Sequence, residues 1–381
     1  MDARQPSSAG AAPARYYRPE LDILRFVAFM LVFLNHAAPS DGAFWSQFAF
    51  LGPLTSILIA LPIGGAFGVD LFFALSSFLI TTLLLKEQEA EGRIDIRGFY
   101  LRRLLRIWPL YFVFMLAIRP LVPLFFPEES MSWGMNLAFL LFVGNLASAI
   151  FGFPHSVAAI LWSVSMEEQF YLAWPLIVKR WTSRLMTVAV AMIVIAFVTR
   201  IVLVAMGAEH HGMWANTLAR LDPIACGMIL AVVAKRREIA LTPLKRLALL
   251  AFGAGILLLI GRYGSSVGVK ALATMPAGTI ACTAIILATL GMPLPGLDKN
   301  PILRALVYLG RISYGLYVFH MVFVMSLHVA EVGDPLRRAT LMIAALAGTT
   351  VCAMISYHLL ERPFLKLKDR FAHIKSTPVK V

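Results

Sequence analysis

The sequence predicts an all-α protein, a polytopic bundle of about ten transmembrane helices. Two observations lead to this prediction. Of the 381 residues, 59% are hydrophobic and only 14% are charged, with a mean hydropathy of +0.78, whereas a soluble domain of this size needs many more polar residues to cover its surface. Apolar runs of about 18 to 22 residues also recur along the chain, which is the length a helix needs to cross the hydrocarbon core.

The apolar runs have basic residues gathered at alternate ends. In chain order they cover residues 21–38, 67–86, 104–126, 135–153, 161–178, 185–206, 214–234, 246–261, 271–291, 305–328 and 337–360. Lys and Arg mark cytoplasmic loops, and the loops 40–66, 127–160 and 207–213, which we assign to the outside, contain neither. The exceptions to this asymmetry are Arg262, Lys270, Arg337 and Arg338.

Segment 135–153, "MNLAFLLFVGNLASAIFGF", carries two Asn and two Gly. If it crossed the membrane completely, basic loops that follow it would lie outside, so the charge pattern holds only if this segment does not fully span. We therefore predict about ten spanning helices, one re-entrant or interfacial segment at 135–153, and both termini in the cytoplasm. The membrane domain covers 20–364, between an expected disordered cytoplasmic tail at 1–19 and a basic cytoplasmic tail at 365–381. No cleavable signal peptide is apparent, because the N-terminal stretch lacks an apolar core.

Charge and cysteine usage exclude two classes of site. A net charge of +13 fits nucleic-acid binding, but the basic residues cluster at the ends of apolar runs, so we expect lipid contact and no nucleic-acid partner. Cys226, Cys282 and Cys352 lie inside apolar runs without metal-type spacing. We expect no bound metal.

Several polar side chains converge on one depth in the outer half of the bilayer. Counted at helical rise, His36 lies about 22 Å above the cytoplasmic face and Glu167 about 9 Å below the outer surface. A single intramembrane His often bonds a neighbouring helix, but ionisable residues from separate segments at one depth indicate function. The other members of this layer are Asn35, Asp70, Ser163, Arg220, Asp222 and His320.

A second polar layer lies at the inner face. Arg103 and Arg106 of "FYLRRLLRIWP" share a helix face, and Arg102 matches Arg106 at i+4. An arginine pair at a cytoplasmic helix end is often only a topology anchor, but such a pair also suits a diphosphate, because guanidinium groups bind phosphate oxygens bidentately. Asp22 and Arg25 are one turn apart, and we expect them to pair in a structural role.

These segments resemble the acyltransferase-3 family of membrane O-acyltransferases, which modify bacterial surface glycans and nodulation factors. "ELDILRFVAFMLVFLNHA" resembles its opening motif, "FYLRRLLRIWPLY" its Arg-x-x-Arg motif, and "LWSVSMEEQFYLAWPL" the motif whose key carboxylate falls on Glu167. "GGAFGVDLFFALSSFLIT" is similar to the second-helix motif, with Ser77 where Gly is usual, and "LGRISYGLYVFHM" and "HLLERPF" match the closing elements. The resemblance runs from about Glu20 to Phe364 and is to the single-domain form, without a periplasmic esterase-like domain.

The resemblance implies an acyl-CoA donor, acetyl-CoA first of all, on the cytoplasmic side of a bacterial inner membrane. It implies a glycan or lipid-linked saccharide acceptor on the outer side, and it assigns the essential histidine to His36. With Arg102, Arg103 and Arg106 as the donor-binding residues, the thioester arm climbs roughly 20 Å at helical rise to reach this imidazole.

The catalytic residues expected are His36 and Glu167. His36 acts as general base on the acceptor hydroxyl or takes the acyl group covalently, and the sequence leaves both open. Glu167 is expected to orient the ring. Ser163, Ser165, Asn35 and Arg220 are candidates for stabilising the oxyanion. The main alternative is a multi-pass transporter or exporter with an intramembrane polar site, although no internal repeat supports it.

Overall fold

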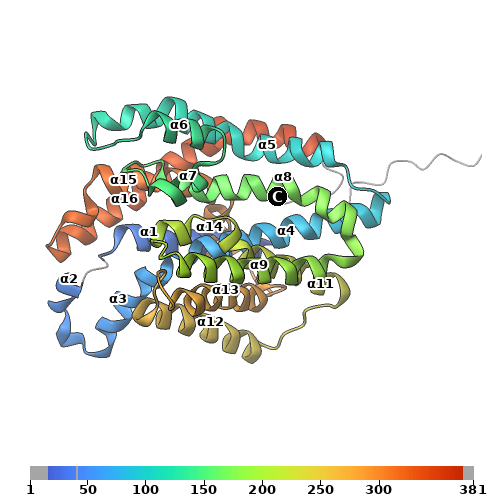
Figure 1. Ribbon diagram of the computed structural model, residues 1–381, viewed down its shortest axis with the longest axis horizontal. Helices are drawn as coiled ribbons and strands as arrows, with labels where there is room; N and C mark the ends of the chain where they lie inside the picture. The colour runs from blue at the N-terminus through green and yellow to red at the C-terminus, as the bar shows by residue number, and fades with distance from the viewer. Residues whose placement is uncertain (1–15, 40–41, 372–381) are drawn as a thin grey trace, which may run out of the picture.

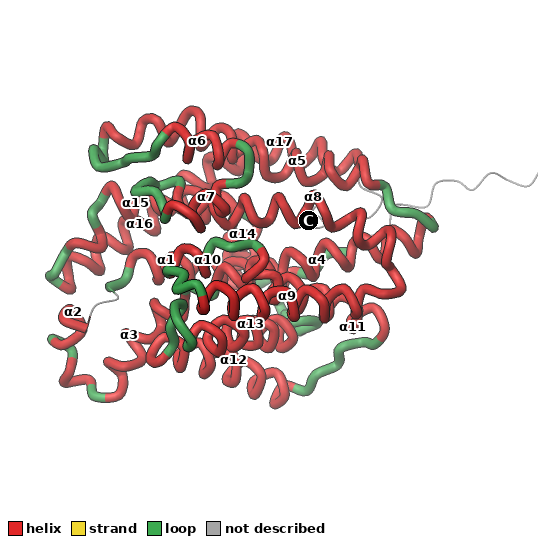
Figure 2. The backbone as a smooth tube through the Cα atoms, in the orientation of Figure 1, coloured by secondary structure: helices red, strands yellow, loops and turns green. Residues whose placement is uncertain are grey.

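The computed structural model is all-helical, which confirms the predicted fold class (Figure 1). It describes residues 16–39 and 42–371. The structure is 80% helix, and the described residues contain no β-strand, as the tube in Figure 2 shows. The predicted tails at 1–19 and 365–381 lie largely outside the described residues.

Within the described residues, nine helices of 16 or more residues run roughly along the long axis of the molecule (Figure 1). They are α1 (Pro19–Ala37), α4 (Gly68–Glu91), α5 (Ile96–Val113), α8 (Trp162–Trp181), α9 (Leu185–Ala205), α11 (Leu221–Arg236), α12 (Pro243–Tyr263), α13 (Ala271–Thr289) and α16 (Pro335–Ser356). The shorter helices are α2 (Gly42–Ser46), α3 (Pro53–Gly65), α6 (Trp133–Leu140), α7 (Gly144–Phe151), α10 (His210–Trp214), α14 (Pro301–Arg311), α15 (Ser313–Ser326) and α17 (Arg362–Lys368). Two π-helical turns, Phe114–Ile118 and Tyr357–Glu361, extend α5 and α16.

Six helical stretches among the described residues are long and apolar enough to cross a membrane, so the protein is a multi-pass integral membrane protein. One of them, Ala159–Ala205, is two helices, because the chain turns at Thr182–Arg184 between α8 and α9 (Figure 1). The sequence predicted about ten spanning helices, and fewer than ten helices meet the criteria of length and apolar composition among the described residues. Helix α11 has only 16 residues, and α1 carries three charged residues in its first two turns.

Segment 135–153 forms two short helices, α6 and α7, of 8 residues each. A helix of this length is about 12 Å long and cannot cross a bilayer alone, in agreement with the prediction for this segment. Phe142 lies between them in the left-handed region, with φ 56°. Its ring stacks on Trp108 at 5.7 Å and lies 4.5 Å from the Tyr111 ring, so burial against α5 offsets the backbone strain.

Two other segments differ from the sequence interpretation. The run 305–328, expected as one span, is broken at Ile312 into α14 and α15, which are bent by 77°. Helix α14 begins where Asn300 accepts hydrogen bonds from the amides of Ile302 and Leu303. The outer loop expected at 40–66 contains the 13-residue apolar helix α3.

Small residues allow the central helices to pack closely. Gly227 of α11 lies against the backbone of Ala74 in α4, and Gly261 of α12 lies against the backbone of Ala60 in α3. A Cβ at either glycine would collide with a backbone carbonyl, so the close approach requires Gly. The packing places α4, the most buried of the candidate spans, in the middle of the bundle.

Candidate functional site

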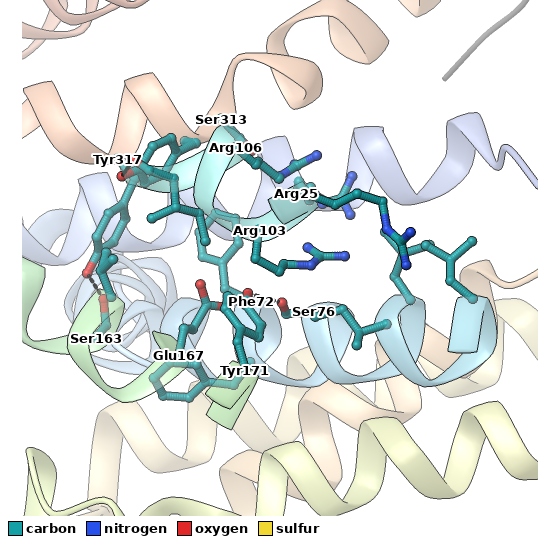
Figure 3. A pocket seen from close by; sticks show the side chains of 18 of the residues that line it. Arg25, Phe72, Ser76, Arg103, Arg106, Ser163, Glu167, Tyr171, Ser313 and Tyr317 are labelled. Carbon is teal, nitrogen blue, oxygen red and sulfur yellow. Dashed lines mark hydrogen bonds between the residues drawn. The ribbon is translucent and has the colours of Figure 1, made fainter. Parts of the chain in front are cut away.

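A cavity of about 130 Å³ lies among α1, α4, α5, α8 and α15, and we call it the inner cavity. Figure 3 shows the guanidinium groups of Arg25, Arg103 and Arg106 gathered toward one end of it, and Ser163 and Tyr317 at the other end. The structure thus brings Arg102, Arg103 and Arg106, the three arginines predicted to bind the donor, into one cavity. Its basic lining residues are Arg25, Arg102, Arg103, Arg106 and Lys368.

The arginines of this cavity are not equivalent. Arg102 forms an ion pair with Glu87 at 2.9 Å. Arg103 and Arg106 form no ion pair or hydrogen bond within the described part of the chain, and the Nε atom of Arg103 is buried without a partner. The Arg103 guanidinium instead lies 5.3 Å from the ring centroid of Tyr171. Arg103 and Arg106 therefore carry charge that a bound anion can match.

The N-terminal end of α1 is held by a polar cluster. The predicted pair forms, because Arg25 donates to Asp22 at 2.8 Å. The hydroxyl of Tyr17 donates to the same carboxylate at 2.8 Å and accepts from Arg311 at 3.0 Å. Burial and the negative charge of Asp22 raise the pKa of Tyr17 to about 12, so the phenol stays protonated and keeps donating.

Glu167 lines the inner cavity and not the surroundings of His36. It lies beside Tyr171 and below Arg103 (Figure 3). The Tyr171 hydroxyl is 2.5 Å from the hydroxyl of Ser76. No hydrogen bond joins Glu167 to His36 among the described residues, so the pairing of these two residues that the sequence predicted does not form.

A second cavity, of about 560 Å³, is lined by His36 and Asn35 of α1, and we call it the outer cavity. Asn35 donates to the backbone carbonyl of Pro62 at 3.0 Å. The outer cavity has no Asp, Glu, Lys or Arg among its described lining residues. Its walls come in part from the predicted outer loops, and its aromatic lining residues are Phe67, Phe153, Trp162, Trp214 and the imidazole of His210.

His36 is hydrogen-bonded to a second imidazole. Its Nδ1 lies 3.0 Å from Nε2 of His320 on α15, and the ring centroids are 5.1 Å apart. Nδ1 of His320 in turn lies 2.6 Å from the carbonyl oxygen of Tyr317. His320 is fully buried, and an edge of Phe29 packs against it at 6.0 Å between centroids. The structure therefore brings together two members of the predicted polar layer that are 284 positions apart.

A thin wall separates the two cavities. The Tyr317 hydroxyl, at the end of the inner cavity, donates to the carbonyl oxygen of Ile160 at 2.9 Å and lies 2.7 Å from the hydroxyl of Ser163. Ile160 lines the outer cavity. The sequence predicted that the thioester arm reaches His36 from the arginines, whereas the structure has two separate cavities, with the hydrogen-bonded Tyr317, Ser163 and Ile160 between them.

The geometry can be compared with known proteins. The model of the acyltransferase-3 family, described as an acyltransferase domain, matches residues 18–358. The chain belongs to this family. The match includes the helices that bear both cavities, from the start of α1 to the end of α16.

Relatives of this acyltransferase-3 protein are named as O-acetyltransferases. The peptidoglycan O-acetyltransferase OatA of Listeria monocytogenes is 27% identical over 376 residues, 93% of this chain and 56% of OatA. YrhL of Bacillus subtilis, provisionally named a peptidoglycan O-acetyltransferase, is 28% identical over 79% of this chain and 50% of its own length. The chain therefore spans a little over half the length of the relatives it matches. No solved structure matches it.

Three predicted polar residues of this acyltransferase-3 protein belong to a buried ionic network. Asp70 of α4 pairs with Arg220, and Asp222 of α11 pairs with Arg200 of α9. Thr279 of α13 donates to Asp222 at 2.9 Å. The network balances two positive and two negative charges, links four helices and lines neither cavity.

Residues that the sequence did not single out include Tyr317 of the inner cavity, His210 of the outer cavity and Arg200 of the ionic network. Arg200 sits in the otherwise apolar run 185–206, where a lone basic residue without a nearby acid was the available signal. His210 falls in the outer loop predicted at 207–213, but it lines the outer cavity, stacks on Trp214 at 5.5 Å between ring centroids and is hydrogen-bonded to the hydroxyl of Ser266 at 2.5 Å. Its position depends on the fold of α10, which the sequence pattern did not indicate.

Proposed function

We propose that the protein is a membrane O-acyltransferase that moves an acyl group, acetyl first of all, from cytoplasmic acyl-CoA to a hydroxyl of an extracytoplasmic saccharide. The observation that supports this most is the pair of cavities with opposite chemistry, one on each side of a wall next to an imidazole. Family membership and relatives named as O-acetyltransferases support the same reaction class.

The inner cavity is the proposed donor site. Arg103 and Arg106 hold phosphate oxygens of coenzyme A through charge-assisted hydrogen bonds, with Arg25 near the same end. The volume of the inner cavity, about 130 Å³, is the smaller of the two, which suits an extended pantetheine arm better than a sugar ring. The arm runs past Glu167 toward Ser163 and Tyr317 and carries the thioester to the wall.

The outer cavity is the proposed acceptor site. It is lined by aromatic rings and by neutral donors such as Asn35, Ser265 and Ser266, without a charged Asp, Glu, Lys or Arg. Such a lining favours an uncharged sugar unit, whose faces pack on aromatic rings and whose hydroxyls bond neutral groups. OatA is named for acetylation of peptidoglycan, which supports a glycan or a lipid-linked saccharide as acceptor.

The reaction requires the wall to open. When the side chain of Tyr317 parts from Ser163, the thioester carbonyl reaches the acceptor beside His36. His36 takes the proton of the acceptor hydroxyl, the oxygen attacks the carbonyl carbon, and the C–S bond breaks. The coenzyme A thiolate leaves and takes the proton from the His36 imidazolium, and the Ser163 hydroxyl, once Tyr317 has moved, is the proposed donor to the oxyanion. A variant in which His36 carries the acyl group covalently uses the same geometry.

The proposal includes the orientation in the membrane. The arginine end faces the cytoplasm in the bacterial inner membrane, with about ten spans and both termini on that side. This orientation gives the donor site access to cytoplasmic acyl-CoA and the outer cavity access to extracytoplasmic saccharide.

Thiol release from acetyl-CoA by the purified, lipid-reconstituted protein tests the proposal. We expect release of coenzyme A that depends on added saccharide, together with an acetylated sugar detected by mass spectrometry. A transporter, the second class considered, leaves the thioester intact. Intact acetyl-CoA in the presence of peptidoglycan fragments and of lipid-linked saccharides would contradict the acyltransferase proposal.

A further inference from the structure

We propose that His320 is a positioning residue that fixes which nitrogen of His36 is free to take a proton. The proposal rests on the function proposed above, because it concerns the general base of that reaction. His320 lines neither described cavity and is fully buried, so it acts on substrate only through His36.

The hydrogen bonds allow one arrangement of protons for two neutral rings. The carbonyl oxygen of Tyr317 can only accept, so Nδ1 of His320, 2.6 Å away, carries the hydrogen. Nε2 of His320 then has a lone pair and accepts from Nδ1 of His36 at 3.0 Å. The proton on His36 is therefore on Nδ1, and Nε2 of His36 is the bare nitrogen.

The bare nitrogen is the one that the outer cavity needs. His36 lines that cavity, whereas its Nδ1 is occupied by His320. In the opposite tautomer, Nε2 of His36 carries a hydrogen and can only donate to the acceptor hydroxyl, so it cannot remove the proton. A partner that holds a base in the correct tautomer is the role that a carboxylate has in a catalytic triad. Here a neutral imidazole anchored on a helix carbonyl has that role, in the place where the sequence predicted Glu167.

The ring of His320 is held so that it cannot turn away. It is packed by Phe29 at 6.0 Å and by Tyr317 at 5.6 Å between centroids, and it lies one helical turn after Tyr317. Tyr317 therefore serves two features at once, because its carbonyl anchors His320 while its hydroxyl closes the wall. Movement of the Tyr317 side chain would open the wall, while its backbone carbonyl stays bonded to Nδ1 of His320 and Phe29 stays packed against the ring.

Two variants of similar size test the proposal. His320→Gln keeps an oxygen that can accept from Nδ1 of His36, whereas His320→Met fills the space without a strong acceptor. We expect His320→Met to lower kcat for saccharide acetylation by about 100-fold, with KM for acetyl-CoA unchanged, and His320→Gln to recover at least about ten-fold of that loss. Both proteins are first checked for a single gel-filtration peak in detergent.

The outcomes separate this proposal from the function on which it rests. Equal kcat values for His320→Gln and His320→Met, or wild-type kcat in His320→Met, would overturn the role of His320, provided that wild type is active and His36→Ala is not. A wild-type protein that never releases coenzyme A contradicts the function itself. If His320→Met does not yield a folded protein, His320→Asn is used in its place, because its amide oxygen is too short to reach Nδ1 of His36 as the Gln oxygen does. A kcat of His320→Asn above that of His320→Gln would then contradict the proposal.

Discussion

The inner and outer cavities differ above all in charge. The inner cavity has Arg103 and Arg106 without partners among the described residues, whereas the outer cavity is lined by Phe153, Trp162 and other neutral groups. The first can hold an anionic ligand through charge and the second an uncharged ligand through shape and stacking. Two substrates recognised by different physics can therefore meet at one wall without competing for each other's site.

The largest expected effect is on kcat and comes from His36, which lines the outer cavity. His36→Ala removes the proposed base, and we expect kcat to fall by at least about 1,000-fold, within the range that general bases contribute. The measurement is coenzyme A release with a saturating saccharide. The control for folding is the binding of acetyl-CoA to the variant, measured by equilibrium dialysis. Wild-type turnover in His36→Ala would remove the imidazole from the mechanism.

The next effect concerns stability, because the ionic network links four helices of the bundle. Arg200→Ala leaves Asp222 as an unmatched buried charge, and breaking such a pair costs about 3–5 kcal/mol. We expect a lower yield of folded protein and an earlier midpoint of thermal unfolding in detergent. Arg184→Ala, on an exposed residue of the same region of the chain, is the matched control. An unchanged midpoint in Arg200→Ala would show that the network is not required for the fold.

The third effect sharpens the comparison on the donor side. Arg103→Ala or Arg106→Ala removes a charge-assisted hydrogen bond of about 1.5–3 kcal/mol, so KM for acetyl-CoA is expected to rise by about 10-fold or more. KM for the saccharide stays the same. Arg97→Ala, on the exposed face of the same helix, is the control and leaves both constants unchanged. A rise in the saccharide KM alone would exchange the roles of the two cavities.

The smallest effect tests the acceptor side. Phe153→Ala removes one aromatic face from the outer cavity, and a loss of about 1 kcal/mol raises KM for the saccharide by about 5-fold. KM for acetyl-CoA is not expected to move. Phe151, two positions earlier, is exposed and does not line the cavity, so Phe151→Ala is the matched control. Equal effects of the two variants would contradict an acceptor site in this cavity.

The sequence predicted those features that depend on local pattern. The length of the apolar runs predicted the helices. The i, i+3 spacing of Arg103 and Arg106 predicted that they share a helix face, and both side chains line the inner cavity. The family followed from ordered motifs, and the matched model bears it out. The Asp22–Arg25 pair was also predicted correctly, because one turn of helix fixes it.

The features that the sequence did not predict depend on contacts between distant segments. The bend at Ile312 sets the direction of α15, which brings His320 to His36. The polar residues were grouped by their predicted depth in the membrane, but residues at one depth can lie on different sides of a helix. Glu167 therefore faces the arginines, and Asp222 faces Arg200, although both were placed in the same layer as His36.

Transfer across a sealed membrane tests the central claim most directly. The protein is reconstituted into vesicles with radiolabelled acetyl-CoA inside and a saccharide acceptor only outside. We predict that labelled O-acetyl saccharide forms outside while coenzyme A accumulates inside, and that vesicles with His36→Ala form neither. Acetylation that occurs only when donor and acceptor share one side of the membrane would contradict a wall with the donor on one face and the acceptor on the other.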